Sequence, residues 1–289
     1  MEGIRIRDRM TEDLRLRGRS PRTIEAYVTQ ARLFCAHYGK SPLKLGREDV
    51  RAYLLHRLDR DGVSGSTNTV CLASLKFLYG VTLKRPEVVA EIPFPKVAQR
   101  LPEVLTGSEV MRWLECVMPE RQRMAAKLMY GLGLRGGESL GLRPRDVDGG
   151  RRILHVRQGK GQRDRDLPLH PKLLRELRTY WERERPARDA YLFPGADGVR
   201  PLSLESCRDA LRRGARKAGI RKHVSAHTLR HCYATHTLQL GANPVSIQRM
   251  LGHASITTTV RYLRLVPEHL AQLKNPFEVL GTDEGTILR

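Results

Sequence analysis

The sequence predicts a mainly α-helical protein of two domains, the second of which carries a small β-hairpin sheet. Three observations support this fold class. Apolar residues recur at three- and four-residue steps along most of the chain, which is the spacing of a buried helical face. A proline-rich basic stretch interrupts that pattern near residue 95. Two short apolar runs flank a glycine-rich turn near residue 160, as in a β-hairpin.

The first ninety residues are patterned as helices. Ser20-Pro21 is a typical helix start, a cap residue followed by proline in the first turn, and the apolar face that follows ends at Gly39. The same pattern repeats in two further segments, on Val50, Tyr53, Leu54 and Leu58 and, after a turn at 61–66, on Val70, Ala73, Phe77 and Leu78.

A proline-rich stretch follows and predicts the domain boundary. Its prolines are Pro86, Pro93, Pro95 and Pro102. Because proline breaks regular elements and Lys96 and Arg100 add positive charge, we expect an extended basic linker at 93–103. It would separate a domain of residues 1–92 from one of residues 104–265, with residues 266–289 as a C-terminal tail. A loop inside a single domain is the alternative.

The second domain begins with a capping box at Thr106 and Glu109, and helical periodicity continues to about Leu142. The turn at 159–162 then lies between two apolar runs and forms the tip of the expected hairpin. The remaining helices are expected at 171–185, 203–218, 227–240, 245–251 and 256–263, followed by an amphipathic stretch at 267–280.

The charge balance indicates a polyanionic partner. Lys and Arg total 52 against 31 acidic residues, a net charge of +21. Such an excess repels itself in a compact protein, whereas binding nucleic acid neutralises it and releases counterions. A merely basic surface is the alternative.

The cysteines and the hydropathy indicate the compartment. The five cysteines include no C-x-x-C pair and predict free thiols in a reducing environment. No apolar run approaches the roughly 18 residues of a membrane span, and no signal core precedes the first helix. We therefore expect a cytoplasmic protein.

Several polar residues stand beside predicted helix and hairpin ends. In chain order they are Arg135 with Glu138 in YGLGLRGGESLGL, Lys160 at the hairpin tip, His227 and Arg230 in HTLRH, and His253 in LGH, nine residues before Tyr262. Each taken alone has an ordinary interpretation, such as a surface arginine, a solvated turn or a half-buried tyrosine. His227 and His231 are spaced for zinc, but the glutamate of an H-E-x-x-H motif is missing, so we expect no metal site.

The order and spacing of this set resemble the tyrosine recombinases, the family of the Xer, Cre and lambda integrase proteins. The resemblance covers about Ser20 to Leu263. It is carried, in this order, by SPRTIEAYVTQARLF, GLGLRGGESLGLRPRDVD, VRQGKGQRDRDLPL, HTLRHCYATH and LGHASITTTVRY. It implies that the first domain is a helical, SAM-like core-binding domain and that the second is an α+β catalytic domain.

The resemblance implies a nucleophile and a phosphate clamp. Tyr262 would attack the scissile phosphate and become linked to the 3′ side of the cut strand. Arg135 and Arg230 would hold that phosphate, since guanidinium forks match phosphate oxygens and stabilise the charge of the transition state.

The resemblance also implies the proton-transfer groups. Lys160 would protonate the departing 5′ oxygen, a role open to lysine and closed to arginine, which keeps its proton at useful pH. His227 and His253 would hydrogen-bond the phosphate, with His227 able to move a proton, and Glu138 would orient Arg135 or a neighbouring histidine.

For partners, the resemblance implies four protomers on two double-stranded DNA sites, exchange through a Holliday junction, and no ATP, metal or other cofactor. The tail residues Leu270, Leu273 and Phe277 would pack on a neighbouring protomer or on their own domain. Candidate DNA contacts are Arg22, Lys96, Arg100, Arg163, Arg208 and Arg212.

Two other classes remain open. A non-catalytic DNA-binding protein would explain the charge but not the ordered polar set. A tyrosine-dependent nicking enzyme would explain Tyr262 but would require a metal-binding histidine pair and a β-rich core.

Overall fold

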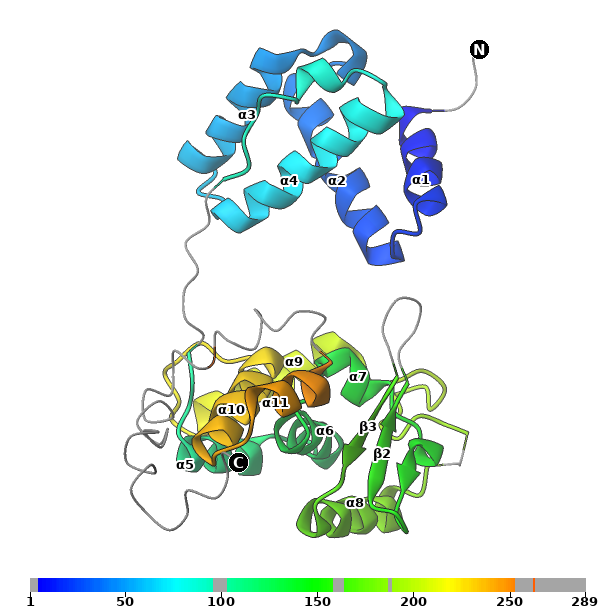
Figure 1. Cartoon of the computed structure of the whole chain (residues 1–289), viewed down its shortest axis with the longest axis vertical. Helices are drawn as coiled ribbons and strands as arrows, with labels where there is room; N and C mark the ends of the chain where they lie inside the picture. The colour runs from blue at the N-terminus through cyan, green and yellow to red at the C-terminus, as the bar shows by residue number, and fades with distance from the viewer. Residues whose placement is uncertain (1–4, 96–102, 158–163, 187–188, 253–261, 263–289) are drawn as a thin grey trace, which may run out of the picture. The chain divides into compact units, whose positions relative to one another are not determined.

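The computed structural model describes residues 5–95, 103–157, 164–186, 189–252 and 262 (Figure 1). The chain divides into two compact units, Met1–Arg100 and Leu101–Arg289. All five cysteines are free thiols. Within the described ranges, no helix combines the length and the apolar character needed to cross a membrane.

The first unit is a helical domain with its own apolar core. Its helices are α1 (Ile6–Leu16), α2 (Pro21–Tyr38), α3 (Arg47–Asp59) and α4 (Gly65–Phe77), with helical turns at Pro42–Lys44, Leu78–Thr82 and Pro86–Val88. The expected start and end of α2 are confirmed. The side chain of Ser20 accepts a hydrogen bond from the N–H of Thr23 at 3.3 Å, and Gly39 ends the helix in the left-handed region at φ 59°.

Two apolar residues expected in this core are exposed instead. In α3, the buried face consists of Val50, Tyr53, Leu54 and Arg57, so Leu58 lies at its edge and is 37% exposed. The Arg57 guanidinium donates to Gln30 and lies over the Tyr53 ring, which makes its burial tolerable. Val70, at 40% exposed, faces away from the side of α4 that is buried. Both expectations were wrong because tertiary packing selected a slightly different helical face.

The second unit packs helices around a small sheet. Its helices are α5 (Gly107–Cys116), α6 (Glu120–Gly131), α7 (Gly136–Leu140), α8 (Pro171–Glu184), α9 (Leu204–Lys217), α10 (Ala226–Gln239) and α11 (Pro244–Leu251), with a helical turn at Pro144–Asp146. The sheet joins β1 (Val147–Asp148), β2 (Ile153–Val156) and β3 (Arg165–Pro168), in that order and antiparallel. The expected hairpin is thus confirmed as β2 and β3, and β1 adds a short strand that the sequence pattern did not reveal.

The helical region expected from Thr106 to about Leu142 is broken into α5, α6 and α7. The capping box at its start is confirmed, with the Thr106 N–H 2.7 Å from a Glu109 carboxylate oxygen. Pro119 precedes α6, and Gly133 turns the chain between α6 and α7 at φ 64°. A Cβ added to Gly133 would lie 2.5 Å from the Tyr233 ring, so glycine is required both for the conformation and for the close packing. This turn brings Arg135 to the N-terminus of α7.

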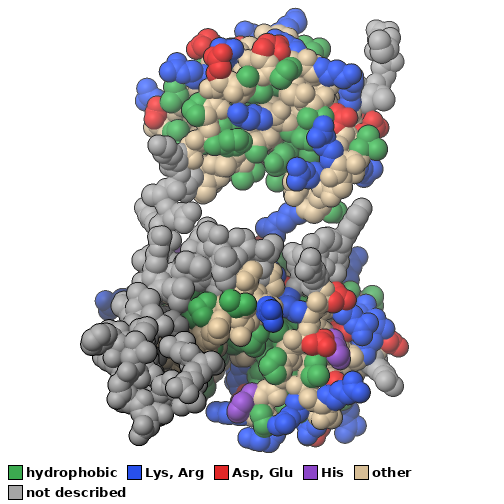
Figure 2. Space-filling view, viewed as in Figure 1, with side chains coloured by type: hydrophobic (Ala, Val, Ile, Leu, Met, Phe, Trp, Pro, Cys, Tyr) green, Lys and Arg blue, Asp and Glu red, His purple; other side chains and the backbone are tan. Residues whose placement is uncertain are grey.

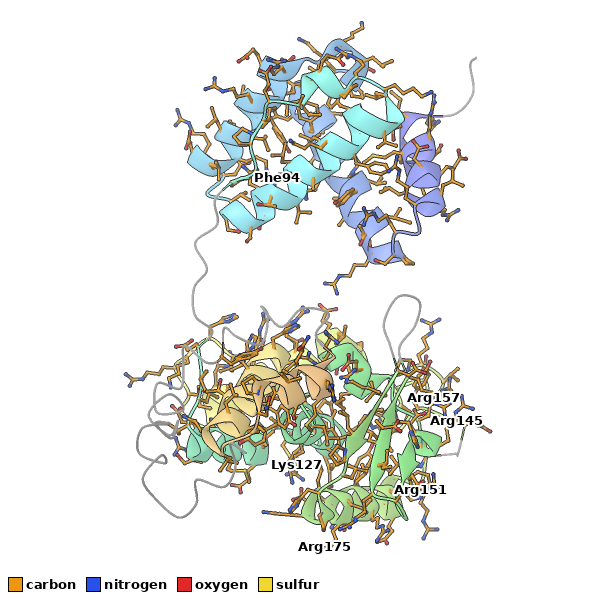
Figure 3. All side chains as sticks on the ribbon, viewed as in Figure 1. Phe94, Lys127, Arg145, Arg151, Arg157 and Arg175 are labelled. Carbon is orange, nitrogen blue, oxygen red and sulfur yellow. The ribbon has the colours of Figure 1, made fainter. Side chains whose placement is uncertain are left out.

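Basic side chains cover much of the described surface. Figure 2 shows Lys and Arg side chains on the visible face of both units, with acidic side chains between them. In the second unit, Arg145, Arg151 and Arg157 lie about the small sheet, and Arg175 lies on α8 (Figure 3). This distribution is consistent with the net charge of the sequence.

Candidate active site

The N-terminus of α7 holds the first pair of expected site residues. Arg135 is the residue at the N-cap of α7, and Glu138 lies three residues later. A carboxylate oxygen of Glu138 is 2.9 Å from the backbone N–H of Arg135, and the other is 2.6 Å from its guanidinium. The contact expected between Glu138 and Arg135 is therefore present, and it fixes both the backbone and the side chain of the arginine.

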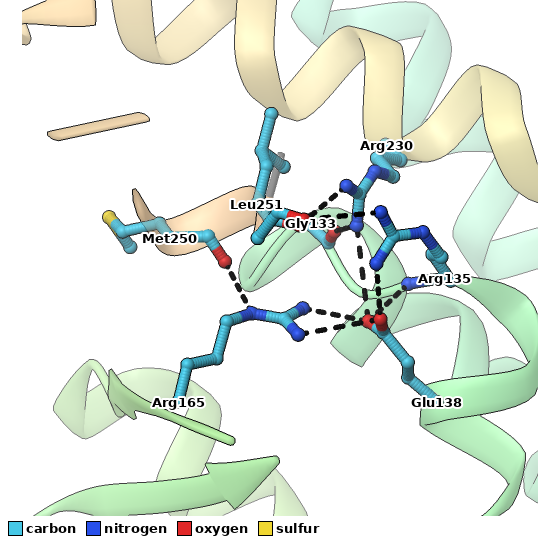
Figure 4. Close-up of polar contacts among 8 residues, drawn as sticks. Gly133, Arg135, Glu138, Arg165, Arg230, Met250 and Leu251 are labelled. Carbon is cyan, nitrogen blue, oxygen red and sulfur yellow. Dashed lines mark hydrogen bonds and ion pairs between the residues drawn. The ribbon is translucent and has the colours of Figure 1, made fainter. Parts of the chain in front are cut away.

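Glu138 is also the centre of a cluster of three guanidiniums (Figure 4). Arg165, from the start of β3, lies 2.7 Å from the carboxylate, and Arg230, from α10, lies 3.9 Å from it. The Glu138 side chain is only 8% exposed. Because three positive charges face one negative charge, the cluster keeps a net positive charge that favours an anion.

The same three arginines bind backbone carbonyls at the C-terminal end of α11. The last carbonyls of a helix have no partner within the helix, and cations are favoured there. The pairs are Arg165 with Met250 at 2.7 Å, Arg230 with Leu251 at 2.6 Å and Arg135 with Gly252 at 3.4 Å. Arg230 also donates to the carbonyl of Gly133 at 2.7 Å. The cluster thus ties together four segments that are far apart in sequence.

Tyr262 is buried beside α10 and α11. It is 3% exposed and packs in a small apolar cluster with Leu238, Ile247 and Leu251. Its phenol oxygen lies 2.8 Å from Nδ1 of His231, and the phenol interacts electrostatically with Arg230. Tyr262 therefore contacts α10, the helix that carries one of the two expected phosphate-binding arginines.

Burial and the guanidinium charges determine the protonation states. Burial, and then the charge of Arg135, lower the pKa of Arg230 to about 10, so it stays charged at neutral pH. Burial alone would raise the pKa of Glu138, but Arg165 and the backbone N–H of Arg135 hold it below its usual value. Partial desolvation, followed by the charges of Arg230 and Arg135, lowers the pKa of His227. This histidine is exposed at the start of α10, where it is accessible to a ligand.

Other expected site residues lie elsewhere or outside the described residues. Lys160, His253, Lys96, Arg100 and Arg163 fall outside them, as do the tail residues Leu270, Leu273 and Phe277 and the helix expected at 256–263, apart from Tyr262. Arg22 is exposed at the start of α2, and Arg208 and Arg212 are exposed on α9. Arg212 lines a shallow hollow together with further basic residues, namely Arg213, Arg216, Arg221, Lys222 and His223.

Arg165 and His231 were not predicted as site residues from the sequence. Arg165 stands in QRDRDLPL among other charged residues, and no local pattern distinguishes it. His231 was considered only as a possible zinc ligand with His227. In the part of the chain that the structure describes, no group of three or more His, Cys, Asp or Glu side chains is arranged to hold a metal.

Comparisons with known proteins agree with this architecture. The family model described as "Phage integrase family" matches residues 103–269, and "Phage integrase, N-terminal SAM-like domain" matches residues 6–87. The Sinorhizobium fredii protein y4qK, whose name assigns it to the integrases and recombinases, is 38% identical, with 95% of this chain and 89% of that protein covered. Tyrosine recombinase XerA of Thermococcus kodakarensis is 33% identical, with 92% and 93% covered.

A solved structure of a recombinase on DNA shares the fold. The XerH site-specific recombinase bound to its palindromic difH substrate has a TM-score of 0.73 and 21% identity, with 96% of this chain and 86% of that chain covered.

Proposed function

This chain belongs to the phage integrase family of tyrosine recombinases, and on that premise we propose that it is a site-specific DNA recombinase that cuts and rejoins strands through a covalent 3′-phosphotyrosyl intermediate. The observation that carries the proposal is the arrangement around Glu138. Arg135 and Arg230 share its carboxylate, and the phenol of Tyr262 contacts His231, the residue that follows Arg230 in α10.

The proposed reaction begins with phosphate binding. A phosphodiester carries one negative charge, and attack on phosphorus adds to it, so cations positioned in advance lower the barrier. Arg135 and Arg230 are positioned in advance by Glu138 and by backbone carbonyls. His227 is placed at the exposed end of the cluster, and we assign it, with His253, a hydrogen bond to the phosphate.

Strand cleavage then transfers the phosphate to Tyr262. The phenol oxygen bonds to phosphorus, the bond to the 5′ oxygen breaks, and Lys160 protonates that oxygen. The phosphotyrosine conserves the energy of the broken backbone bond, so rejoining requires neither ATP nor a metal. A second strand exchange resolves the Holliday junction made by the first.

The proposed assembly is a tetramer on two double-stranded DNA sites in the cytoplasm. We propose residues 1–92 as the core-binding domain, residues 104–265 as the catalytic domain and residues 93–103 as the linker between them. Deleting the residues after Leu265 should leave binding of a single DNA site intact and reduce assembly of the junction complex. Unchanged assembly would show that the tail does not join protomers.

The central experiment uses a suicide substrate, a nicked duplex carrying the target site, with the products separated on a denaturing gel. We expect a covalent protein–DNA adduct that persists in EDTA and disappears in Tyr262→Phe. An adduct that requires divalent metal would favour a nicking enzyme. Sequence-specific binding with no adduct would favour a non-catalytic DNA-binding protein.

A further inference from the structure

The contact between His231 and Tyr262 places a second functional group at the proposed nucleophile. The Tyr262 phenol oxygen lies 2.8 Å from Nδ1 of His231, and the two ring centroids are 5.6 Å apart. His231 projects from α10 one residue after Arg230, the buried arginine of the cluster. The imidazole therefore contacts the atom that would attack phosphorus.

We propose that His231 is the catalytic base for Tyr262: as the phenol oxygen bonds to phosphorus, its proton passes to Nδ1 of His231. The inference rests on the proposed role of Tyr262 as nucleophile. It requires the imidazole tautomer whose proton is on Nε2, so that the Nδ1 lone pair accepts the hydrogen bond from the phenol.

The step is balanced. The bond from phosphorus to the 5′ oxygen breaks, and its electron pair leaves on that oxygen, which is protonated by the general acid proposed above. In rejoining, a 5′ hydroxyl bonds to phosphorus and gives its proton to Lys160, the bond from phosphorus to Tyr262 breaks, and His231 returns its proton to the phenol oxygen. The same imidazole thus serves as base in cleavage and as acid in rejoining.

The surroundings of His231 keep its ring neutral and so able to accept a proton, but the same low pKa makes it a weak base until a negative charge enters the site. Burial, then the charges of His227 and Arg230, lower the pKa of His231 to about 4, so the ring is neutral near neutral pH. A bound phosphodiester brings a negative charge that offsets these positive charges and raises the proton affinity of the ring. Activation of the phenol is therefore coupled to the presence of DNA in the site.

A second, half-buried histidine–tyrosine pair joins the same helix, α10, to α6, and it provides a matched control. Nδ1 of His236 lies 2.9 Å from the hydroxyl of Tyr130, and its Nε2 lies 2.9 Å from the carbonyl oxygen of Leu105. His236 thus has a comparable pairing but no proposed catalytic partner. Changing each histidine in turn separates a chemical role from a packing role.

The first measurement is the single-turnover rate of adduct formation on the suicide substrate, using the full chain. Glutamine in His231→Gln keeps a polar group beside the phenol but takes up no proton near neutral pH. We expect the rate to fall about 100-fold or more, as for loss of a general base. DNA affinity should stay close to the wild-type value, and His236→Gln should cleave at nearly the wild-type rate. Wild-type cleavage by His231→Gln would overturn the inference.

The second measurement replaces Tyr262 with a fluorinated tyrosine, whose phenol is more acidic and needs less help in losing its proton. With this residue, most of the rate lost in His231→Gln should be recovered. An equal loss with both tyrosines would overturn the base role, because a group that only positions the ring is not replaced by acidity. Should His231→Gln not fold, His231→Asn serves in the same comparison.

The two proposals fail in distinguishable ways. If the wild-type protein forms no adduct that depends on Tyr262, the proposed function is wrong and the role of His231 falls with it. If the wild-type adduct forms and the two His231 measurements give the negative results above, only the base role is wrong.

Discussion

Removing the charge of Glu138 tests whether this carboxylate is what allows three guanidiniums to lie together. In Glu138→Gln the amide oxygen can still accept hydrogen bonds, but Arg135, Arg165 and Arg230 lose their common counter-charge. The side chains of Arg165 and Arg230 are only 9% and 4% exposed, so water does little to replace it.

The expected loss in the free energy of unfolding is about 3–5 kcal/mol, the usual cost of removing one partner from a buried ion pair. The matched control is Glu176→Gln. Glu176 is paired with Lys127 at 2.5 Å, but these side chains are 33% and 27% exposed, and the expected loss is at most about 1 kcal/mol. Both variants exchange a carboxylate for an amide, so the difference between them reports the burial of Glu138 together with its three guanidinium partners.

Urea unfolding followed by tryptophan fluorescence measures this difference, because both tryptophans, Trp113 and Trp181, belong to the second unit. Inorganic phosphate should stabilise Glu138→Gln more than the wild type, since the unbalanced guanidiniums then bind the anion more tightly. Saturation at 100 times the dissociation constant corresponds to about 2.7 kcal/mol.

Equal losses in Glu138→Gln and Glu176→Gln would refute this reasoning. They would mean that the guanidiniums are held apart by their carbonyl partners and that the carboxylate does not stabilise the cluster. If phosphate stabilises Glu138→Gln no more than the wild type, the proposal that the cluster binds an anion is refuted.

Three further predictions concern Gly133 in the turn before α7, His231 in α10 and Arg165 at the start of β3. Gly133→Ala should lower the free energy of unfolding in urea by about 2–4 kcal/mol, because the φ of Gly133 is 64° and the new Cβ would clash. The control Gly137→Ala has open space around the new Cβ and should be neutral or slightly stabilising. Similar losses in the two variants would contradict this reasoning. The pKa of His231 is lowered in the folded state, so the neutral ring contributes its full stability above about pH 6.5, and this contribution is lost as the pH falls towards 4. In His231→Gln, the free energy of unfolding should therefore fall less steeply over that pH range. An unchanged slope would argue against this assignment. Arg165→Gln should slow cleavage by loosening the hairpin that carries Lys160, and a 5′-phosphorothiolate leaving group, which needs no proton, should restore much of the rate, as it should for Lys160→Ala. Absence of rescue in both variants would argue against the acid role of Lys160, and absence in Arg165→Gln alone would indicate that Arg165 acts on the phosphate-binding arginines instead.

Local chemistry made much of the fold predictable. The start of α2 at Ser20-Pro21, its end at Gly39 and the capping box at Thr106 depend on contacts within one helical turn, so the sequence alone reveals them. The β2–β3 hairpin followed from apolar runs on either side of a glycine-rich turn. The choice between Arg57 and Leu58 for the buried face of α3 did not follow, because it depends on Gln30 in another helix.

The sequence by itself determined that a tyrosine, two histidines, two arginines, a lysine and a glutamate stand in an order typical of one family. Only the tertiary structure decided which groups meet. Glu138 joins three arginines that lie between 3 and 92 residues away from it in the chain, and His231 meets a tyrosine 31 residues further on. Apart from the pair Arg135–Glu138, which lies within one helical turn, such contacts leave no periodic or local signal, because each depends on how separate segments pack. The neighbours of a buried charge or phenol are therefore set by the folded chain, although the residues themselves were visible from the start.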